Sequence, residues 1–255
     1  MLSIIESADN KKFKYAKKLK QRKYRERLNA YLIEGVNLIE EAIKVDAPIE
    51  VIFVCEGVNA VDYGKDAFIL AKNLFAELSE TETSQGVIAV VEKPKFDLKD
   101  LAISSTDNVV VLDRLQDPGN IGTIIRTAVA AGYKAIFTLK GTGDIYSPKT
   151  VRSTAGVMNR IPIIEIGSEE ELISLLRTLN IQLVSTSPAA TKYYYDYDLS
   201  KGIALIIGNE GSGISDGLIE KSDINVKLPM SNDVESLNAA VAAAIIMYES
   251  VRKKY

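Results

Sequence analysis

Histidine is absent from all 255 residues of the chain. This absence excludes a Ser–His or Cys–His catalytic pair, a histidine general base and any histidine-ligated metal site. The single cysteine, Cys55, follows the apolar run 51–54 and cannot form an internal disulfide, so we expect a buried thiol and a reducing compartment. No apolar run approaches the ~20 residues of a membrane span, and the N-terminus has no signal-peptide core, which together predict a cytoplasmic protein.

Charge is unevenly distributed, although the net charge is only -3. Residues 11–27 carry ten lysine and arginine side chains against one acid, Glu26, which leaves a local charge of +9. Such a segment attracts a phosphate backbone. Because Phe13, Tyr15 and Tyr24 place aromatic rings between the charges, on which bases could stack, nucleic-acid binding is favoured over the alternative of a solvated helix face.

Patterns in the first part of the chain predict a small α/β domain. Apolar residues at helical spacing alternate with short β-branched runs. The expected helices cover residues 13–22, 36–43 and 68–75, and the expected strands cover residues 31–33, 51–54 and 86–91. A polar, turn-rich stretch follows, so we place a first domain at residues 1–95 and a linker at residues 96–107.

From residue 108 the pattern becomes that of a larger α/β domain, which we place at residues 108–255. Residues 109–112 form a continuous apolar run of the kind that is buried on both faces of a parallel sheet. Asn120 and Ser236 are expected to be N-caps of helices. The alternation of elements predicts a mostly parallel sheet. The expected strands are 109–112, 135–139, 161–166, 181–185, 203–207 and 225–228, and the expected helices are 121–129, 169–179 and a last helix from residue 237.

Two loops of this domain have the composition of a ligand site. Residues 208–213 are rich in glycine and follow the strand 203–207, and ligands of parallel α/β sheets bind at the carboxyl ends of strands. The run has neither the Walker order nor the G-x-G-x-x-G order. Residues 228–238 follow another strand and offer backbone N–H groups, a hydroxyl and an amide before a helix. The alternative for both loops is an ordinary turn. The tyrosine-rich run 193–197 belongs to neither loop.

Three stretches carry a resemblance to one enzyme family. Residues 117–128, residues 207–214, and residues 228–230 together with 236–238 closely resemble, in the same order, the three motifs of the SpoU family. These are S-adenosylmethionine-dependent RNA ribose 2′-O-methyltransferases of the SPOUT class. The N-terminal part resembles the family's RNA-binding extension through residues 22–25, 33–35 and 85–87.

The resemblance implies a parallel α/β domain with a deep trefoil knot, a rare exception to unknotted topology. It also implies S-adenosylmethionine as cofactor, no metal, a homodimer, and RNA as partner, with large-subunit rRNA favoured over tRNA. A non-catalytic RNA-binding protein that keeps the fold is the other alternative. The residues implied for RNA binding are Arg22, Lys23 and Arg25.

At each motif position that the resemblance assigns to the active site, this chain has a residue that agrees with the family's pattern. The positions implied at the reacting centre are Asn120, Arg126, Glu210, Ser236 and Asn238. The positions implied for cofactor binding are Ser185, Thr186, Ser187, Ile207, Gly208, Leu228, Met230 and Leu237. Because an arginine stays protonated, we expect Arg126 to bind phosphate and stabilise negative charge instead of acting as the general base that is proposed for the family.

Overall fold

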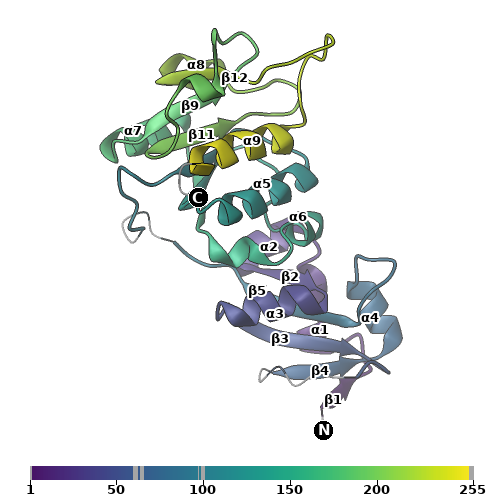
Figure 1. Ribbon diagram of the computed structural model, residues 1–255. Helices are drawn as coiled ribbons and strands as arrows, with labels where there is room; N and C mark the ends of the chain where they lie inside the picture. The colour runs from purple at the N-terminus through teal and green to yellow at the C-terminus, as the bar shows by residue number, and fades with distance from the viewer. Residues whose placement is uncertain (1, 60–62, 64–65, 97, 99–100, 253–255) are drawn as a thin grey trace. The chain divides into compact units, whose positions relative to one another are not determined.

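In the computed structural model the chain divides into two compact units (Figure 1), and residues 2–59, 63, 66–96, 98 and 101–252 are described. The N-terminal unit comprises residues 1–95 and 144–159, and the C-terminal unit comprises residues 96–143 and 160–255. Each unit has its own sheet and its own hydrophobic core. None of the helices in the described part of the chain is long and apolar enough to cross a membrane.

The N-terminal unit is built on a five-stranded sheet with the order β1-β4-β3-β5-β2. β1, β4 and β3 are parallel, and β5 is antiparallel to both β3 and β2. The strands are β1 (Ser3–Ile5), β2 (Ala30–Glu34), β3 (Ile49–Cys55), β4 (Ala67–Leu70) and β5 (Val87–Glu92). The helices are α1 (Lys11–Lys18), α2 (Arg22–Leu28), α3 (Val36–Lys44), α4 (Lys72–Leu78) and α6 (Pro148–Ser153). β1 and α6 have no counterpart among the sequence-based predictions.

One core cluster of this unit joins α1 and α4 to the sheet. Phe13 on α1, Phe53 on β3 and Phe75 on α4 are all buried in it. The expectation that the Phe13 ring is available to stack on bases is therefore wrong, because the apolar core already covers it. Cys55, expected to be buried, is only partly buried, since it ends β3 at the margin of the same cluster.

The basic segment forms two short helices where the pattern predicted one over residues 13–22. α1 begins after Asn10, whose side chain accepts hydrogen bonds from two backbone N–H groups of the first turn. It ends where Leu19 becomes fully buried. α2 then ends at Asn29, which has the left-handed backbone conformation (φ 51°) that asparagine tolerates better than most residues. The break between the two helices is at Gln21, whose backbone is extended (φ -100°, ψ 133°), and charge counting does not detect it.

Arg25 lies inside the N-terminal unit and not on its surface. Its side chain is 5% exposed and donates hydrogen bonds to Asp144 through Nε (3.2 Å) and through Nη2. Nη1 donates to the carbonyl oxygens of Leu19 (2.6 Å) and Lys20 (2.8 Å). A guanidinium that is buried and engaged in this way cannot bind a phosphate of RNA, so the prediction for Arg25 is corrected. Its role is to hold residues 144–159 against α2.

We expect Arg25→Ala to lower the free energy of unfolding by about 3–5 kcal/mol, because it leaves the largely buried Asp144 carboxylate without its partner. Lys23→Ala is the matched control, since Lys23 is exposed on the same helix, and it should change stability by less than about 0.5 kcal/mol. Urea unfolding of both variants measures the difference. Equal stability of the two variants would contradict a structural role for Arg25.

Residues 68–75 were expected to form one helix, and the structure divides them between β4 and α4. β4 is the parallel partner of both β1 and β3, with Phe68 opposite Ser3 and Phe53. A short apolar run has no periodicity that separates strand from helix. The pairing with two neighbouring strands decides the conformation here.

Two short segments that carry the resemblance to the RNA-binding extension meet at the start of α3. Gly35 has φ 110° and donates its N–H to the carbonyl oxygen of Val87 at 3.0 Å. The Gln85 side chain accepts the N–H of Val36 at 2.8 Å, and a Cβ on residue 35 would lie 2.9 Å from its oxygen. Glycine is needed at position 35 because both the backbone angle and this close approach disfavour a side chain.

The C-terminal unit is built on a seven-stranded parallel sheet with the order β10-β12-β9-β11-β6-β7-β8. The strands are β6 (Val109–Leu112), β7 (Ala135–Leu139), β8 (Ile163–Ile166), β9 (Gln182–Thr186), β10 (Lys192–Tyr193), β11 (Ile203–Ile207) and β12 (Ile224–Lys227). The helices are α5 (Pro118–Ala130), α7 (Glu169–Thr178), α8 (Asp216–Lys221) and α9 (Ala239–Val251), and the 3-10 turns of the chain are η1 (Val157–Arg160) and η2 (Tyr194–Asp196). The predicted parallel α/β fold is confirmed, while β10 and α8 were not anticipated.

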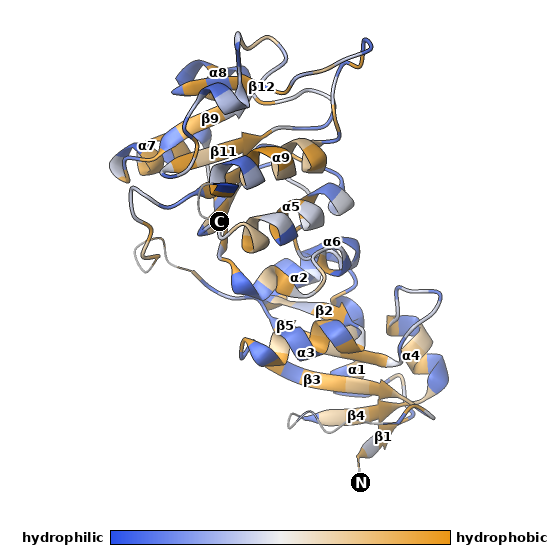
Figure 2. Ribbon diagram, viewed as in Figure 1, coloured by the Kyte–Doolittle hydropathy of each residue, from blue (hydrophilic) through white to orange (hydrophobic). Residues whose placement is uncertain are grey.

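The continuous apolar strands are buried on both faces of this sheet, as their composition predicts. Val109 and Val111 face α7 and α8 in one core cluster. Val110 and Leu112 point to the opposite face and are also fully buried. The remaining helices, α5 and α9, pack against each other, and α9 also contacts β11. Figure 2 shows the apolar colour along β9, β11 and α9.

The division into units differs from the expected boundaries in two places. Part of the expected linker packs on the C-terminal unit, where Leu98 and Ile103 lie against the core cluster. Residues 144–159, expected within the second domain, belong to the N-terminal unit. The hydrogen bonds of Arg25 to Asp144 and of Tyr31 to Asn159 (2.9 Å) explain this assignment. The knotted chain path implied by the resemblance stays a prediction.

Candidate functional site

Four neighbouring strands of the C-terminal unit end at one edge of the sheet. The order β12-β9-β11-β6 is parallel throughout, so the residues that follow each strand are brought to the same edge. Ser187 follows β9, Gly208 follows β11, Leu228 follows β12 and Asp113 follows β6. Such an edge is where ligands of parallel α/β folds bind. The topology therefore brings three of the predicted cofactor positions, Ser187, Gly208 and Leu228, to the same edge.

The glycine-rich loop after β11 is folded tightly on itself. Asn209 and Gly213 exchange backbone hydrogen bonds of 3.0 and 2.9 Å, and the Asn209 side chain accepts the N–H groups of Gly211 (2.9 Å) and Ser212 (3.0 Å). A Cβ on Gly208 would lie 2.3 Å from the backbone of Gly213 and 2.3 Å from that of Ile214. The backbone of the loop is therefore held in one conformation by its own hydrogen bonds, and only glycine fits at position 208.

Three of the predicted reacting-centre residues are joined directly. The Asn120 side-chain amide donates to Glu210 at 3.1 Å, and its carbonyl oxygen accepts the Asn238 amide at 2.8 Å. Glu210 also accepts the N–H groups of Gln116 (3.0 Å) and Asp117 (2.8 Å). One residue from each of the three motifs is thus held in a single hydrogen-bonded chain at the carboxyl edge.

The hydrogen bonds of Glu210 favour its ionised form. Burial alone would raise the pKa of the carboxyl, but the N–H groups of Gln116 and Asp117 and the Asn120 amide outweigh it, so the pKa lies below the ordinary value of 4.5. A carboxylate that accepts several donors cannot readily serve as a base, because its lone pairs are occupied. The arrangement assigns Glu210 the task of positioning the start of α5.

The lowered pKa gives stability that depends on pH. A carboxyl whose pKa is lowered in the folded state stabilises the fold at pH values above its ordinary pKa, which is 4.5 here. This contribution disappears as the pH falls through the pKa of the folded state. We therefore expect Glu210→Gln to melt at a lower temperature than wild type at neutral pH, and the difference to shrink below pH 4.5.

Thermal melts across this range measure the difference, with Glu220→Gln as the control because Glu220 is exposed on α8. A gap between Glu210→Gln and wild type that stays constant with pH would show that the carboxylate charge is not the cause.

Both helix starts at the site use a different N-cap from the one expected. Asp117 caps α5 by accepting the N–H of Asn120 at 2.8 Å, and Asn238 caps α9 by accepting the N–H groups of Ala240 (2.9 Å) and Val241 (3.2 Å). The expected cap Asn120 is released to bind Glu210 and Asn238. Ser236 is exposed two residues before the actual cap.

Arg126 does not join the hydrogen bonds that link Glu210, Asn120 and Asn238. It is exposed on α5, two turns beyond the start of the helix, and it makes no hydrogen bond or ion pair with any residue that the structure describes. Its charge is available to a ligand.

The predicted cofactor residues are partly enclosed and partly exposed. Ser185 is fully buried in β9 and donates to the Asn225 side chain of β12, so it braces the strands and is closed to a ligand. Thr186, Ser187 and Leu228 are half-buried at the edge, and Ile207 is buried at the end of β11. Met230 and Leu237 stand out as large apolar side chains that remain more than a third exposed.

Asp113 is a site residue that pattern reasoning missed. It is buried directly after β6 and accepts the N–H of Ser215 at 2.7 Å and Nε of Arg114 at 2.8 Å. Its own N–H donates to the carbonyl oxygen of Ile207 at 2.9 Å. Asp113 therefore ties the far end of the glycine loop to the neighbouring strand. An acid directly after a fully apolar strand was the available signal.

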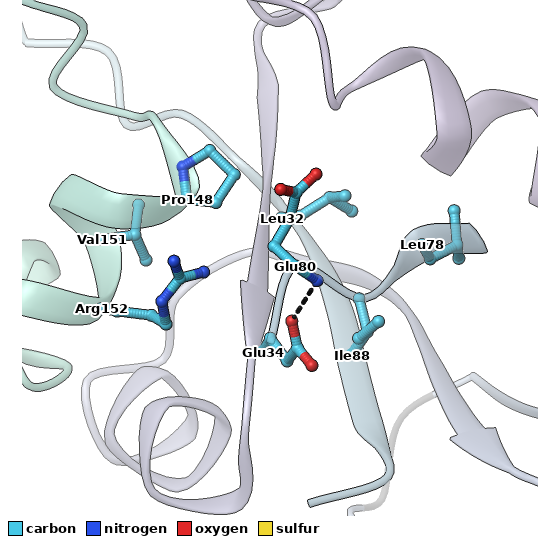
Figure 3. Close-up of a pocket in the computed structure, with 8 residues that line it drawn as sticks. All are labelled: Leu32, Glu34, Leu78, Glu80, Ile88, Pro148, Val151 and Arg152. Atoms are coloured by element: carbon cyan, nitrogen blue, oxygen red, sulfur yellow. Dashed lines mark hydrogen bonds between the residues drawn. The ribbon is translucent and has the colours of Figure 1, made fainter. Parts of the chain in front are cut away.

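A pocket of the N-terminal unit can be set aside as a cofactor site. It is lined by Leu32, Glu34, Leu78, Glu80, Ile88, Pro148, Val151 and Arg152 (Figure 3), and it has room for little more than a water molecule. Glu34 there accepts the N–H of Glu80 at 2.9 Å. Among the described residues, no group of three or more histidine, cysteine, aspartate or glutamate side chains is placed to hold a metal ion.

Comparison with known proteins identifies both parts of the chain. Residues 107–248 match the SpoU rRNA Methylase family, and residues 10–89 match the MRM3-like substrate binding domain. The first match spans all three motifs and every residue predicted at the reacting centre.

Full-length relatives and solved structures agree with these matches. The chain is 37% identical over 247 residues to the 23S rRNA (guanosine(2553)-2'-O)-methyltransferase RlmP of Bacillus subtilis, covering 96% of this chain and 97% of that protein. The SpoU methyltransferase AviRb of Streptomyces viridochromogenes, in complex with AdoMet, has a TM-score of 0.88 at 31% identity, covering 96% and 98% of the two chains. An AdoMet-bound rRNA methyltransferase of Sinorhizobium meliloti has a TM-score of 0.89 at 29% identity, covering 100% and 99%. With its motifs, its fold and its full-length relatives in agreement, the chain belongs to the SpoU rRNA methylase family.

Proposed function

We propose that this protein transfers the methyl group of S-adenosylmethionine to a ribose 2′-hydroxyl of 23S rRNA. The observation that carries the proposal is the hydrogen-bonded chain Glu210–Asn120–Asn238, in which Asn120 bonds to both other residues and which joins the three family motifs at the carboxyl edge of the parallel sheet. The B. subtilis relative is named as a 23S rRNA 2′-O-methyltransferase and aligns over nearly the whole of both chains, which supports the same class of substrate.

The chemistry of the edge fits this cofactor. Met230 and Leu237 offer exposed apolar surface to a flat adenine ring, and the loops after β9, β11 and β12 offer backbone N–H and C=O groups to its polar atoms. We assign Thr186, Ser187, Ile207, Gly208, Leu228, Met230 and Leu237 to holding it, and Ser185 to bracing the strands. When bound, S-adenosylmethionine supplies a methyl group activated by the positive charge of its sulfur.

The residues of the protein then have two tasks: to position the ribose 2′-oxygen and to stabilise the charge on it. Asn120 and Asn238 hold the start of α5 and the start of α9 together, which fixes the loops that frame the reacting atoms. Arg126, exposed and unengaged among the described residues, binds the phosphate next to the reacting ribose and stabilises charge on the 2′-oxygen. Ser236 is close in sequence to Asn238 and is free to contact the ribose.

The experiment that tests the proposal combines binding and product analysis. Calorimetry with S-adenosylmethionine should show binding to the full chain, and incubation with transcribed 23S rRNA should add one 2′-O-methyl mark, located by mapping. Absence of cofactor binding by folded protein would favour a non-catalytic RNA-binding protein. Methylation of tRNA but not of 23S rRNA would contradict the proposed substrate.

The N-terminal unit is proposed to bind the RNA. Arg22 and Lys23 are exposed on α2, and basic residues of α1 extend the same positive segment. Neutralising phosphates with these side chains releases counterions, so affinity should fall steeply with salt. Arg22→Ala combined with Lys23→Ala should weaken RNA binding and reduce the salt dependence, while cofactor binding stays at the wild-type value. An unchanged RNA affinity would leave this segment as a solvated surface.

We also propose that the protein forms a homodimer and works in the cytoplasm. α9 is apolar around most of its circumference, and Val241 (49%) and Tyr248 (54%) remain exposed on it in the isolated chain. A helix with this composition is normally covered on more than one face. Light scattering should give twice the mass of the chain. The single cysteine fits a reducing compartment such as the cytoplasm.

A further inference from the structure

The tyrosine-rich run that no family motif explains forms an ordered aromatic cluster. Tyr193 ends β10, the edge strand of the seven-stranded sheet, and Tyr194 and Tyr195 continue into η2. The rings of Tyr193 and Tyr195 stack with centroids 5.3 Å apart and an interplanar angle of 17°, and Tyr194 meets Tyr195 edge-on at 5.0 Å and 73°. We call Tyr193, Tyr194, Tyr195 and Tyr197 the tyrosine platform.

The platform combines exposure with rigidity. Tyr195 is 49% exposed although its ring is held by two others. The turn beneath it is fixed because Asp196 accepts the N–H of Tyr193 at 2.8 Å. Rings that are already ordered lose little conformational entropy when a further ring stacks on them. A large aromatic surface kept in this state at the edge of a sheet is suited to a flat ligand.

Positive charge lies directly over the rings. Nζ of Lys192 is 5.1 Å from the centroid of Tyr197, and Nζ of Lys227 is 5.2 Å from that of Tyr193. An open hollow of about 220 Å³ lies beside Tyr195 and Tyr197. Its lining includes Arg252, which pairs with Glu249 at 2.9 Å, and the acids Asp196 and Asp198. Aromatic faces flanked by cations match a nucleobase joined to a phosphate.

The platform adjoins the proposed reacting site through the chain itself. Tyr193 lies opposite Lys227 in the pairing of β10 with β12. The residue after Lys227 is Leu228, the first residue of the loop that we assign to the cofactor. An RNA strand whose ribose is held at that loop therefore passes beside the platform.

We propose that the tyrosine platform, with Lys192 and Lys227, stacks an unpaired base of the RNA substrate next to the methylated nucleotide. This inference rests on the proposed function and adds a second RNA contact, located in the C-terminal unit. It follows that the target nucleotide lies in a loop or a bulge, since a base inside a helix cannot present its face to a side chain.

The test uses the full-length chain with three substitutions. Tyr195→Ala should reduce affinity for transcribed 23S rRNA by about 5- to 150-fold, the range observed for removal of one base-stacking aromatic residue. Tyr195→Phe keeps the ring and should stay near wild type. Phe96→Ala removes an exposed aromatic residue elsewhere in the same unit and is the matched control. Calorimetry should show the same S-adenosylmethionine affinity in all of them.

Ultraviolet crosslinking gives a second measurement, because a stacked base should attach to the peptide that contains Tyr193–Tyr197 in wild type. Wild-type RNA affinity in Tyr195→Ala would overturn the inference while leaving the proposed function intact. Failure of the wild-type protein itself to bind 23S rRNA would overturn both. A lower mass of Tyr195→Ala in light scattering, with unchanged RNA affinity, would make the platform a subunit interface and overturn the inference in favour of a protein partner.

Discussion

Replacing Arg126 with alanine should reduce the rate of methyl transfer by about 100- to 1,000-fold, the usual cost of removing one group that stabilises transition-state charge. The side chain is exposed on α5 and engages no described residue, so its loss should leave the fold intact. Affinity for S-adenosylmethionine should stay close to wild type, because the proposed contacts of Arg126 are with RNA. Single-turnover methylation together with calorimetry measures the two quantities separately.

Two further variants make the result specific. Arg126→Lys should keep a small part of the activity, since the positive charge survives while the bidentate fork is lost. Arg177→Ala is the matched control; it removes another arginine of the same unit, one that donates to Asp223 at 2.8 Å, and it should methylate at the wild-type rate. Equal activity of Arg126→Ala and Arg177→Ala would exclude a catalytic role for Arg126.

The pH dependence of the chemical step separates two roles for Arg126. An arginine that only stabilises charge never releases its proton, so Arg126→Lys should lower the rate without changing the shape of the pH–rate profile. A general base would behave differently, because lysine loses its proton at lower pH than arginine does. A clear displacement of the basic limb of the profile toward lower pH would therefore favour the base.

Placing a single methyl group on residue 208 should abolish cofactor binding. A Cβ there would lie 2.3 Å from the backbone of Gly213 and of Ile214, and backbone atoms cannot rotate away as a side chain can. The loop has to open, at a cost of about 1–3 kcal/mol of stability by comparison with other overpacked sites. The obstacle to a side chain at position 208 is therefore the backbone of the loop itself.

Gly211→Ala is the control for Gly208→Ala within the same loop. A Cβ on residue 211 would meet only the side-chain oxygen of Asn209, at an ordinary 3.6 Å. Gly211→Ala should therefore bind S-adenosylmethionine and melt as wild type does, whereas Gly208→Ala should melt earlier and give no binding heat. Wild-type cofactor affinity in Gly208→Ala would show that the loop does not frame the site.

The strands that build the site could be predicted because their composition is unambiguous. β7 and β11 have the predicted bounds, and β6 is the predicted run of four apolar residues. In each of them nearly every position is apolar and β-branched residues are frequent, which is typical of a strand buried on both faces of a parallel sheet. The positions of the glycine loop and of the 228–238 loop follow, since parallel strands bring their carboxyl ends to one edge.

Partners that are distant in sequence were decided by the tertiary structure alone. Glu210 is 90 positions from Asn120, and Asn238 is 118 positions from it, so no local pattern shows that the three side chains join. The same holds for Arg25, which charge counting placed on the surface and which a carboxylate 119 positions away holds in the interior. Whether a charge is solvated or buried depends on what folds against it.

Choices between two locally acceptable conformations were also left to the tertiary structure. Asp117 and Asn120 are both good helix caps, and the need of Glu210 and Asn238 for the Asn120 amide selects Asp117. Residues 67–70 suit a helix or a strand, and pairing with β1 and β3 selects the strand. The sequence by itself therefore determined the strands that build the site, the order of the motifs and the edge at which they meet. The tertiary structure decided which side chains bind one another, because local preferences of about 1 kcal/mol are smaller than the effect of a partner supplied by the rest of the fold.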